Sequence, residues 1–215
     1  MYISKKLFTA SLLATLFILV FAVSAFAEAP ELKASSAILA MTDGEQILFE
    51  KNPDARVSPS GLTKLMTALT AYDESGGDMD AVIIVPENIK ELYNPLEQNI
   101  ALRPGEEITV GSLIQAIIVG SANDAAIALA VHCGGSSEGF AEMMNAKAEG
   151  LGLTDTHFVN PTGNYSEVQY TTAYDLLKIY KEILKIPPLQ SAAQTANTKI
   201  EATNASAILR VFCGY

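Results

Sequence analysis

The first patterned segment of the chain is residues 36–51, where two short apolar runs flank the dipeptide Asp43-Gly44. An Asp-Gly pair between apolar runs is a strong signal for a tight hairpin turn. We therefore predict a β-hairpin here. Two strands are only marginally stable alone, so this hairpin needs further strands or a helical cover.

The middle of the chain has helical spacing. From Gly61 onward, apolar residues recur at intervals of three and four, which predicts a helix with Leu62, Leu65, Met66 and Leu69 along it. Residues 109–135 are strongly apolar, but polar residues interrupt them too often for a membrane span. We interpret them as two core helices separated near Gly120-Ser121. Further helices are predicted over 137–149 and from Thr172 to Lys185, the latter ended by Pro187-Pro188.

The remaining segments predict less regular structure. Residues 81–86 have the pattern of a short buried strand, and residues 86–108, with three prolines, that of a loop with short strand pieces. The last 25 residues favour at most one or two strands. Together these patterns indicate a mixed α/β (α+β) domain.

The N-terminus has the pattern of an export signal. Lys5 and Lys6 precede 21 uncharged residues that end in Ala25-Phe26-Ala27, a small-residue cleavage pattern. We predict a signal peptide over residues 1–27, a folded domain over 28–215 and an extracytoplasmic location, at the cell wall or the outer face of the cytoplasmic membrane. The alternative is an uncleaved membrane anchor, because about 20 apolar residues suffice to span a bilayer.

Composition and charge exclude several classes of protein. The 215 residues are 49% hydrophobic and 18% charged, which is a globular composition, and the net charge is −10. An acidic chain without a basic block is a poor nucleic-acid binder, because phosphate contacts supply most of that affinity. Two cysteines and two histidines do not form a four-ligand zinc site at any usual spacing. Cys133 and Cys213 can pair after export, but we expect two unpaired thiols.

Four motifs occur in a particular order. They are Pro59-Ser-Gly-Leu-Thr-Lys-Leu-Met-Thr-Ala68, Ser121-Ala-Asn-Asp-Ala-Ala126, His157-Phe-Val-Asn-Pro-Thr-Gly163 and Tyr170-Thr-Thr-Ala-Tyr-Asp-Leu176. In order and spacing the chain resembles the D-alanyl-D-alanine carboxypeptidases, the low-molecular-mass serine penicillin-binding proteins, over nearly all of residues 30–210. Each motif alone is weak, but four in order after a signal peptide are specific.

The resemblance implies a fold and a reaction. The fold is that of the β-lactamases and transpeptidases, a helical core against an antiparallel sheet. A serine at the start of a helix attacks the D-Ala-D-Ala carbonyl of a peptidoglycan stem peptide, and a lysine three residues later takes its proton. The partners implied are the stem peptide and β-lactams. No metal or cofactor is implied, and the oligomeric state stays open.

The resemblance also assigns the site residues. Lys64 matches the general base, Ser121 matches the serine that relays protons to the leaving group, and Asn123 matches the asparagine that binds the substrate backbone. Gly61 stands where the family has its nucleophilic serine. The chain contains no Lys-Thr-Gly or Lys-Ser-Gly triplet, which in the family binds the substrate carboxylate and supplies an oxyanion donor. We therefore expect a C-terminally truncated member with an incomplete sheet.

These departures predict impaired or absent activity. Loss of a catalytic serine costs on the order of 10⁶ in turnover. Ser60 lies four residues before Lys64, so contact between them is possible. Adjacent helical residues point about 100° apart, so we expect Ser60 to point away from the place that position 61 faces; a Ser60→Ala variant that is still labelled by penicillin would exclude it as the nucleophile. The alternatives are a non-catalytic wall-binding relative, a decayed gene fragment and a class A β-lactamase-like protein.

Overall fold

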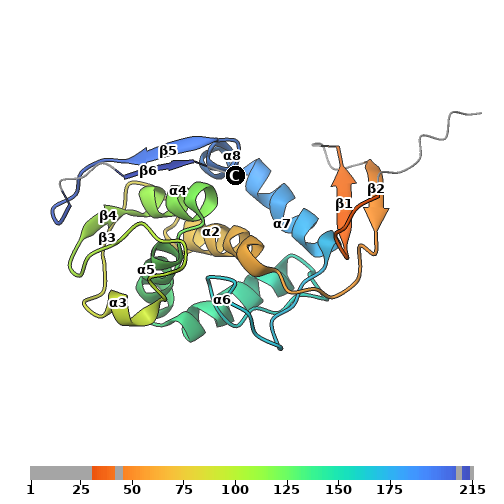
Figure 1. Cartoon of the computed structure of the whole chain (residues 1–215), viewed down its shortest axis with the longest axis horizontal. Helices are drawn as coiled ribbons and strands as arrows, with labels where there is room; N and C mark the ends of the chain where they lie inside the picture. The colour runs from red at the N-terminus through yellow and green to blue at the C-terminus, as the bar shows by residue number, and fades with distance from the viewer. Residues whose placement is uncertain (1–30, 42–45, 207–209, 214–215) are drawn as a thin grey trace, which may run out of the picture. The chain divides into compact units, whose positions relative to one another are not determined.

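Helices form the centre of the computed structural model, which describes residues 31–41, 46–206 and 210–213 (Figure 1). The chain divides into an N-terminal unit, Met1–Lys33, and a larger unit, Ala34–Tyr215. In the first unit only residues 31–33 are described, and they carry no helix or strand. The predicted signal peptide, residues 1–27, lies outside the described ranges.

The predicted helix after Gly61 is confirmed. A short 3-10 helix η1 (Ser60–Leu62) leads directly into α2 (Thr63–Glu74), whose middle is buried. Met66 and Leu69 point into the core as expected, whereas Leu62 is 54% exposed. Leu62 departs from the predicted apolar stripe because it precedes the α-helix and borders a cleft.

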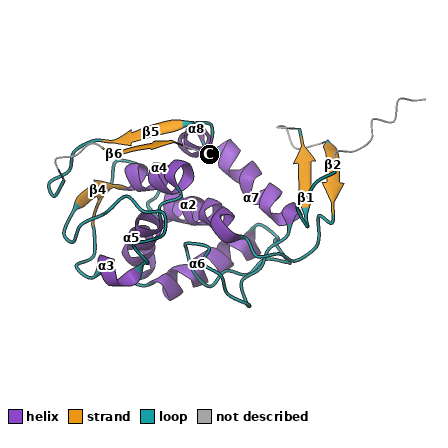
Figure 2. Ribbon diagram, in the orientation of Figure 1, coloured by secondary structure: helices purple, strands orange, loops and turns teal. Residues whose placement is uncertain are grey.

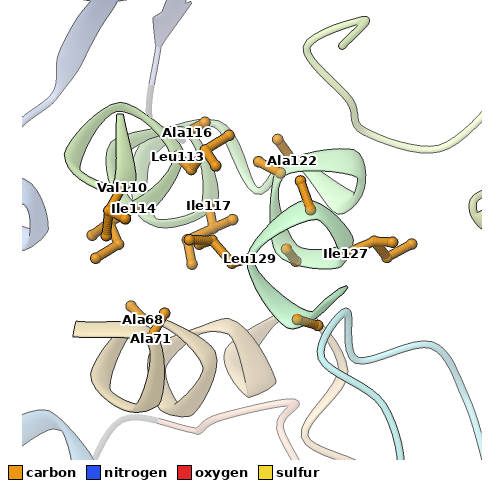
Figure 3. Packing of buried hydrophobic residues seen from close by; sticks show 14 of the residues in the cluster. Ala68, Ala71, Val110, Leu113, Ile114, Ala116, Ile117, Ala122, Ile127 and Leu129 are labelled. Atoms are coloured by element: carbon orange, nitrogen blue, oxygen red, sulfur yellow. The ribbon is translucent and has the colours of Figure 1, made fainter. Parts of the chain in front are cut away.

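The prediction of two consecutive core helices is also confirmed. α4 (Val110–Gly120) and α5 (Asn123–Gly134) are separated by Ser121, which has left-handed backbone angles. Figure 3 shows both helices packed on α2, where Ala68 and Ala71 face the side chains of α4 and α5. Small side chains at this contact allow the backbones to approach closely.

Three further helices cover this centre. α6 (Ser137–Gly150) and α7 (Ala173–Lys185) match the predicted segments and begin at side-chain caps, in which the Ser136 and Thr172 hydroxyls accept N–H groups of the first turn. The sequence did not predict α8 (Pro187–Ala193). Pro187 and Pro188 end α7 as expected, but they also begin α8, since proline suits the first helical turn.

The strands form three separate antiparallel pairs in the part of the chain that is described (Figure 2). β1 (Ala37–Ala40) pairs with β2 (Ile47–Lys51), which confirms the first hairpin, although its turn, residues 42–45, is outside the described ranges. β3 (Val82–Ile84) pairs with β4 (Glu107–Thr109), and β5 (Asn197–Ile200) with β6 (Arg210–Cys213). The mixed α/β class is confirmed.

Two details of the prediction for residues 81–108 were wrong. β3 is not fully buried: Ile83 faces the core, whereas Val82 and Ile84 are 58% and 67% exposed. A continuous apolar run hides this alternation, because the side chains of a strand point to opposite faces whatever their polarity. The segment expected to be loop also contains a short helix, α3 (Ile89–Leu92).

Across the described ranges, no helix combines the length and apolarity needed to cross a membrane.

Candidate functional site

Gly61 lies in η1, directly before α2. A Cβ placed on Gly61 would lie 3.7 Å from the Ser121 Oγ, an ordinary van der Waals distance. Gly61 does not have the positive φ that favours glycine. Position 61 therefore has room for a small side chain, and that side chain would face the Ser121 hydroxyl.

Ser60 borders the same cleft, and its φ of 46° is unusual for a residue other than glycine. The rotation argument against Ser60 assumed ordinary helical geometry, which this φ does not fit. Whether Ser60 takes the place of the nucleophile therefore stays a hypothesis for the Ser60→Ala variant.

Lys64 lies one residue into α2 and is only 5% exposed. Its Nζ donates to the backbone oxygen of Thr162 at 2.7 Å. Burial lowers the Lys64 pKa from 10.5 to about 8, against the opposing effect of the Glu97 charge. A lysine in this state is neutral more often than a lysine in water, which is the property that a general base requires.

The loop 160–163 closes over the start of α2. The Asn160 Oδ1 accepts from the Gly163 N–H at 2.8 Å and from the Thr162 hydroxyl at 3.1 Å, so the run is a turn. The Thr67 hydroxyl donates to the Pro161 oxygen at 2.7 Å, one turn beyond Lys64. Lys64 and Thr67 together anchor this loop on α2.

Ser121 and Asn123 lie where α4 gives way to α5. Ser121 caps α4 with φ 51° and ψ 30°, and Asn123 is the first residue of α5. The Asn123 backbone N–H donates to the Gln98 oxygen at 2.8 Å. Its side-chain Nδ2 donates to the Glu97 Oε2 at 2.5 Å. The site thus contains a carboxylate that the motifs did not indicate.

A cleft of about 670 Å³ connects several of these groups. Gly61, Lys64 and Ser121 all border it, together with Ile117–Val119 of α4 and residues from the end of α8. Asn123 is buried and is not part of the lining. Three of the four residues predicted from the sequence therefore meet in one cleft, and the fourth begins the adjacent helix.

Comparison with known proteins gives this cleft a context. The sequence model of the D-alanyl-D-alanine carboxypeptidase family matches residues 23–210. The chain belongs to the D-alanyl-D-alanine carboxypeptidase family. It is 38% identical over 190 residues to the D-alanyl-D-alanine carboxypeptidase DacF of Bacillus subtilis, and this match covers 84% of the chain and 48% of DacF.

Other members of the D-alanyl-D-alanine carboxypeptidase family are similar over the same region. DacC of Escherichia coli is 33% identical over 187 residues, which cover 82% of this chain and 47% of DacC. The chain thus spans about half the length of these curated relatives. The crystal structure of DacD from Francisella tularensis superposes with a TM-score of 0.70 at 30% identity, over 78% of this chain and 41% of DacD.

A second solved structure supports the same fold. Penicillin binding protein 5 from Haemophilus influenzae superposes with a TM-score of 0.73 at 26% identity, over 85% of this chain and 53% of that protein. The fold class expected from the resemblance is therefore confirmed, and so is membership of the D-alanyl-D-alanine carboxypeptidase family.

Sequence reasoning missed two contributors to the candidate site, the Glu97 carboxylate beside Asn123 and the end of α8 beside the cleft. Glu97 lies in a proline-containing loop, and the sequence offers no signal to distinguish it from an ordinary solvated acid. Ala192 and Ala193 at the end of α8 border the cleft, as does Thr195 just after it, but α8 itself was not predicted. Both enter the site through tertiary packing, which local patterns do not encode.

Cys133 is not among the residues that line the cleft. Cys133 is a free, half-buried thiol in α5, whose pKa burial raises to about 11. The side chain of Cys213 is not described, so their pairing stays untested. In the described ranges no group of three His, Cys, Asp or Glu side chains is arranged to hold a metal ion.

Proposed function

We propose that this cleft is the acyl-transfer site of a serine-type D-Ala-D-Ala carboxypeptidase whose substrate is the peptidoglycan stem peptide. In this assignment Lys64 is the general base, Ser121 relays the proton to the leaving group and Asn123 binds the substrate backbone. Gly61 occupies the nucleophile position without supplying a nucleophile. By the same assignment the protein is exported and meets its substrate outside the cytoplasm.

One observation carries this proposal. The Cβ direction of Gly61 is toward the Ser121 Oγ, 3.7 Å away, and Lys64 lies one turn further along the same helical segment. A hydroxyl at position 61 would therefore enter a cleft bordered by a second serine and by a buried lysine with a lowered pKa. A nucleophile and a base on one helical segment, with a proton relay on a second segment that faces it, are the parts that acyl transfer needs.

The experiment restores the missing group. We expect the chain itself to remain unlabelled by a fluorescent penicillin, and a Gly61→Ser variant to form a stable covalent adduct. The adduct should disappear in a Gly61→Ser, Lys64→Met double variant, because no base then activates the serine. Restoring a catalytic serine corresponds to as much as about 10⁶ in rate, so the difference is visible on a gel.

Two outcomes would contradict the proposal. Labelling of the unchanged chain would mean that another nucleophile is present, and loss of that labelling in Ser60→Ala would identify it. A folded Gly61→Ser variant that is never labelled would mean that the cleft does not support acyl transfer in this chain.

A second candidate function follows from Gly61 itself. A chain that keeps the cleft but lacks the nucleophile suits reversible binding of stem peptides at the cell wall. It predicts heat on titration with a peptide ending in D-Ala-D-Ala and no covalent adduct. The family match favours the carboxypeptidases over the class A β-lactamases that the motifs had left open.

A further inference from the structure

The Glu97 carboxylate lies at the group that is assigned to bind the substrate backbone. The Asn123 Nδ2 donates to the Glu97 Oε2 at 2.5 Å, a short hydrogen bond for an amide donor. The Glu97 charge is also close enough to Lys64 to raise its pKa against the effect of burial. The Glu97 side chain is half-buried. It lies beside Asn123 and close to Lys64, which the proposed function assigns to substrate binding and to general base catalysis.

The loop that carries Glu97 is fixed at several points. The buried Asp124 carboxylate accepts the backbone N–H groups of Ile100 and Leu102 at 2.9 to 3.1 Å. The Asn99 side chain donates to the Glu97 backbone oxygen at 2.7 Å. Because Asp124 and Asn123 are adjacent on α5, the same helix start holds the loop and receives its carboxylate.

We infer that Glu97 competes with ligands for the Asn123 carboxamide: it occupies this group in the free protein, so that the peptide carbonyl of a ligand must displace it. This inference rests on the proposed function, which assigns Asn123 to the substrate backbone. A carboxylate accepts a hydrogen bond more strongly than a peptide carbonyl does. Glu97 is also already part of the chain, so its contact costs no association entropy.

The consequence is a lower affinity for any ligand that uses the Asn123 carboxamide. A ligand gains the Asn123 hydrogen bond only by breaking an existing one, so the net gain is small. A ligand that ends in a carboxylate, as a D-Ala-D-Ala peptide does, also meets the negative charge of Glu97. Removing the side chain should therefore strengthen binding, whereas removing an ordinary surface carboxylate should not.

The test is calorimetric titration of the full chain with an N-acetylated tripeptide that ends in D-Ala-D-Ala. We expect Glu97→Ala to bind it about tenfold more tightly than the unchanged chain, the size of effect that one hydrogen bond to a charged group allows. Glu97→Gln keeps an acceptor oxygen without the charge, so its gain should be smaller. Glu91→Ala, which removes an exposed carboxylate from α3, is the matched control and should change nothing.

The outcomes separate this inference from the proposed function. Measurable binding by the unchanged chain without a gain in Glu97→Ala would overturn the inference and leave the proposed function standing. An equal gain in Glu97→Gln and Glu97→Ala would overturn the role of the hydrogen bond. If neither the unchanged chain nor any variant binds the peptide, the inference also fails. The proposed function is then tested separately, by penicillin labelling of the Gly61→Ser variant.

Discussion

Lys64 is a cation that the fold keeps almost entirely from water, with one backbone carbonyl as its hydrogen-bond partner. Burial disfavours the charged form, and this effect is larger than the opposing attraction of Glu97. Burial therefore has two effects: it makes Lys64 more often neutral and able to accept a proton, and it lowers the stability of the fold while Lys64 is charged. Both effects are expressed in the lowered Lys64 pKa.

That linkage predicts a pH dependence. In the folded chain Lys64 has a pKa of about 8, whereas in the unfolded chain it should titrate near its ordinary value of 10.5. Between these values the unfolded state binds more protons, so the stability contributed by position 64 rises with pH. Relative to Lys64→Met, the chain should gain on the order of 3 kcal/mol between about pH 8 and 10.5, measured by urea unfolding. A constant difference across this range would contradict the lowered pKa.

At the scale of the elements, the start of α2 is fixed by the turn at residues 160–163. Gly163 has φ 85°, and a Cβ placed there would come 1.8 Å from the Ser60 backbone oxygen. No side chain fits this approach. The turn that holds Lys64 and Thr67 thus depends on glycine for two separate reasons, its backbone angle and the space beside it.

Gly163→Ala should therefore lower the free energy of unfolding by more than the strain of an alanine at positive φ, because the new Cβ would also collide with Ser60. The matched control is Gly152→Ala, because Gly152 has φ 67° but nothing within 4 Å of its Cβ position. We expect the free energy of unfolding to fall by about 1 kcal/mol in the control and by at least about 3 kcal/mol in Gly163→Ala, measured by thermal or urea unfolding. Similar losses at both positions would mean that the turn moves away from η1 at little cost.

The elements also show how far sequence patterns reach. The first hairpin, α2, the α4–α5 pair, α6 and α7 were predictable, because each combines its own periodicity with a local stop such as Gly120-Ser121 or a cap such as Thr172. α8 and α3 were not, since prolines mark the end of one helix as readily as the start of the next. In the site, Gly61, Lys64, Ser121 and Asn123 came from motifs. Glu97 required the loop to be folded onto α5, which no local pattern specifies.

At the scale of the whole unit Ala34–Tyr215, one buried ion pair connects the C-terminal strands to the body. Glu106 precedes β4 and is fully buried, and Arg210 of β6 donates to both of its carboxylate oxygens, at 2.6 and 2.9 Å. The Thr203 hydroxyl donates to the same carboxylate at 2.6 Å. Burial alone would raise the Glu106 pKa, but the hydrogen bonds and the Arg210 charge together hold it below its usual value.

Removing Arg210 should consequently destabilise the chain as a whole. Arg210→Met leaves a buried carboxylate without its counter-ion, which costs on the order of 3–5 kcal/mol. Because the Glu106 pKa is lowered in the folded state, the ion pair stabilises above the ordinary pKa of a glutamate and its contribution is lost as the pH falls below that value. The loss caused by Arg210→Met should therefore be large at pH 7 and should shrink as the pH falls below the ordinary pKa of a glutamate, measured by urea unfolding.

Arg56→Met is the matched control for this prediction. Arg56 also forms a hydrogen-bonded ion pair, with Asp155 at 2.8 Å, but both side chains are about half exposed. Exposed pairs contribute little, so this variant should change stability only slightly. Equal effects at positions 56 and 210 would mean that the C-terminal strands are not anchored through Glu106.

The same unfolding curves test whether the chain is a decayed fragment. A single cooperative transition that shifts in Arg210→Met requires one packed unit that extends from β4 to β6. Absence of a cooperative transition would support the decayed fragment.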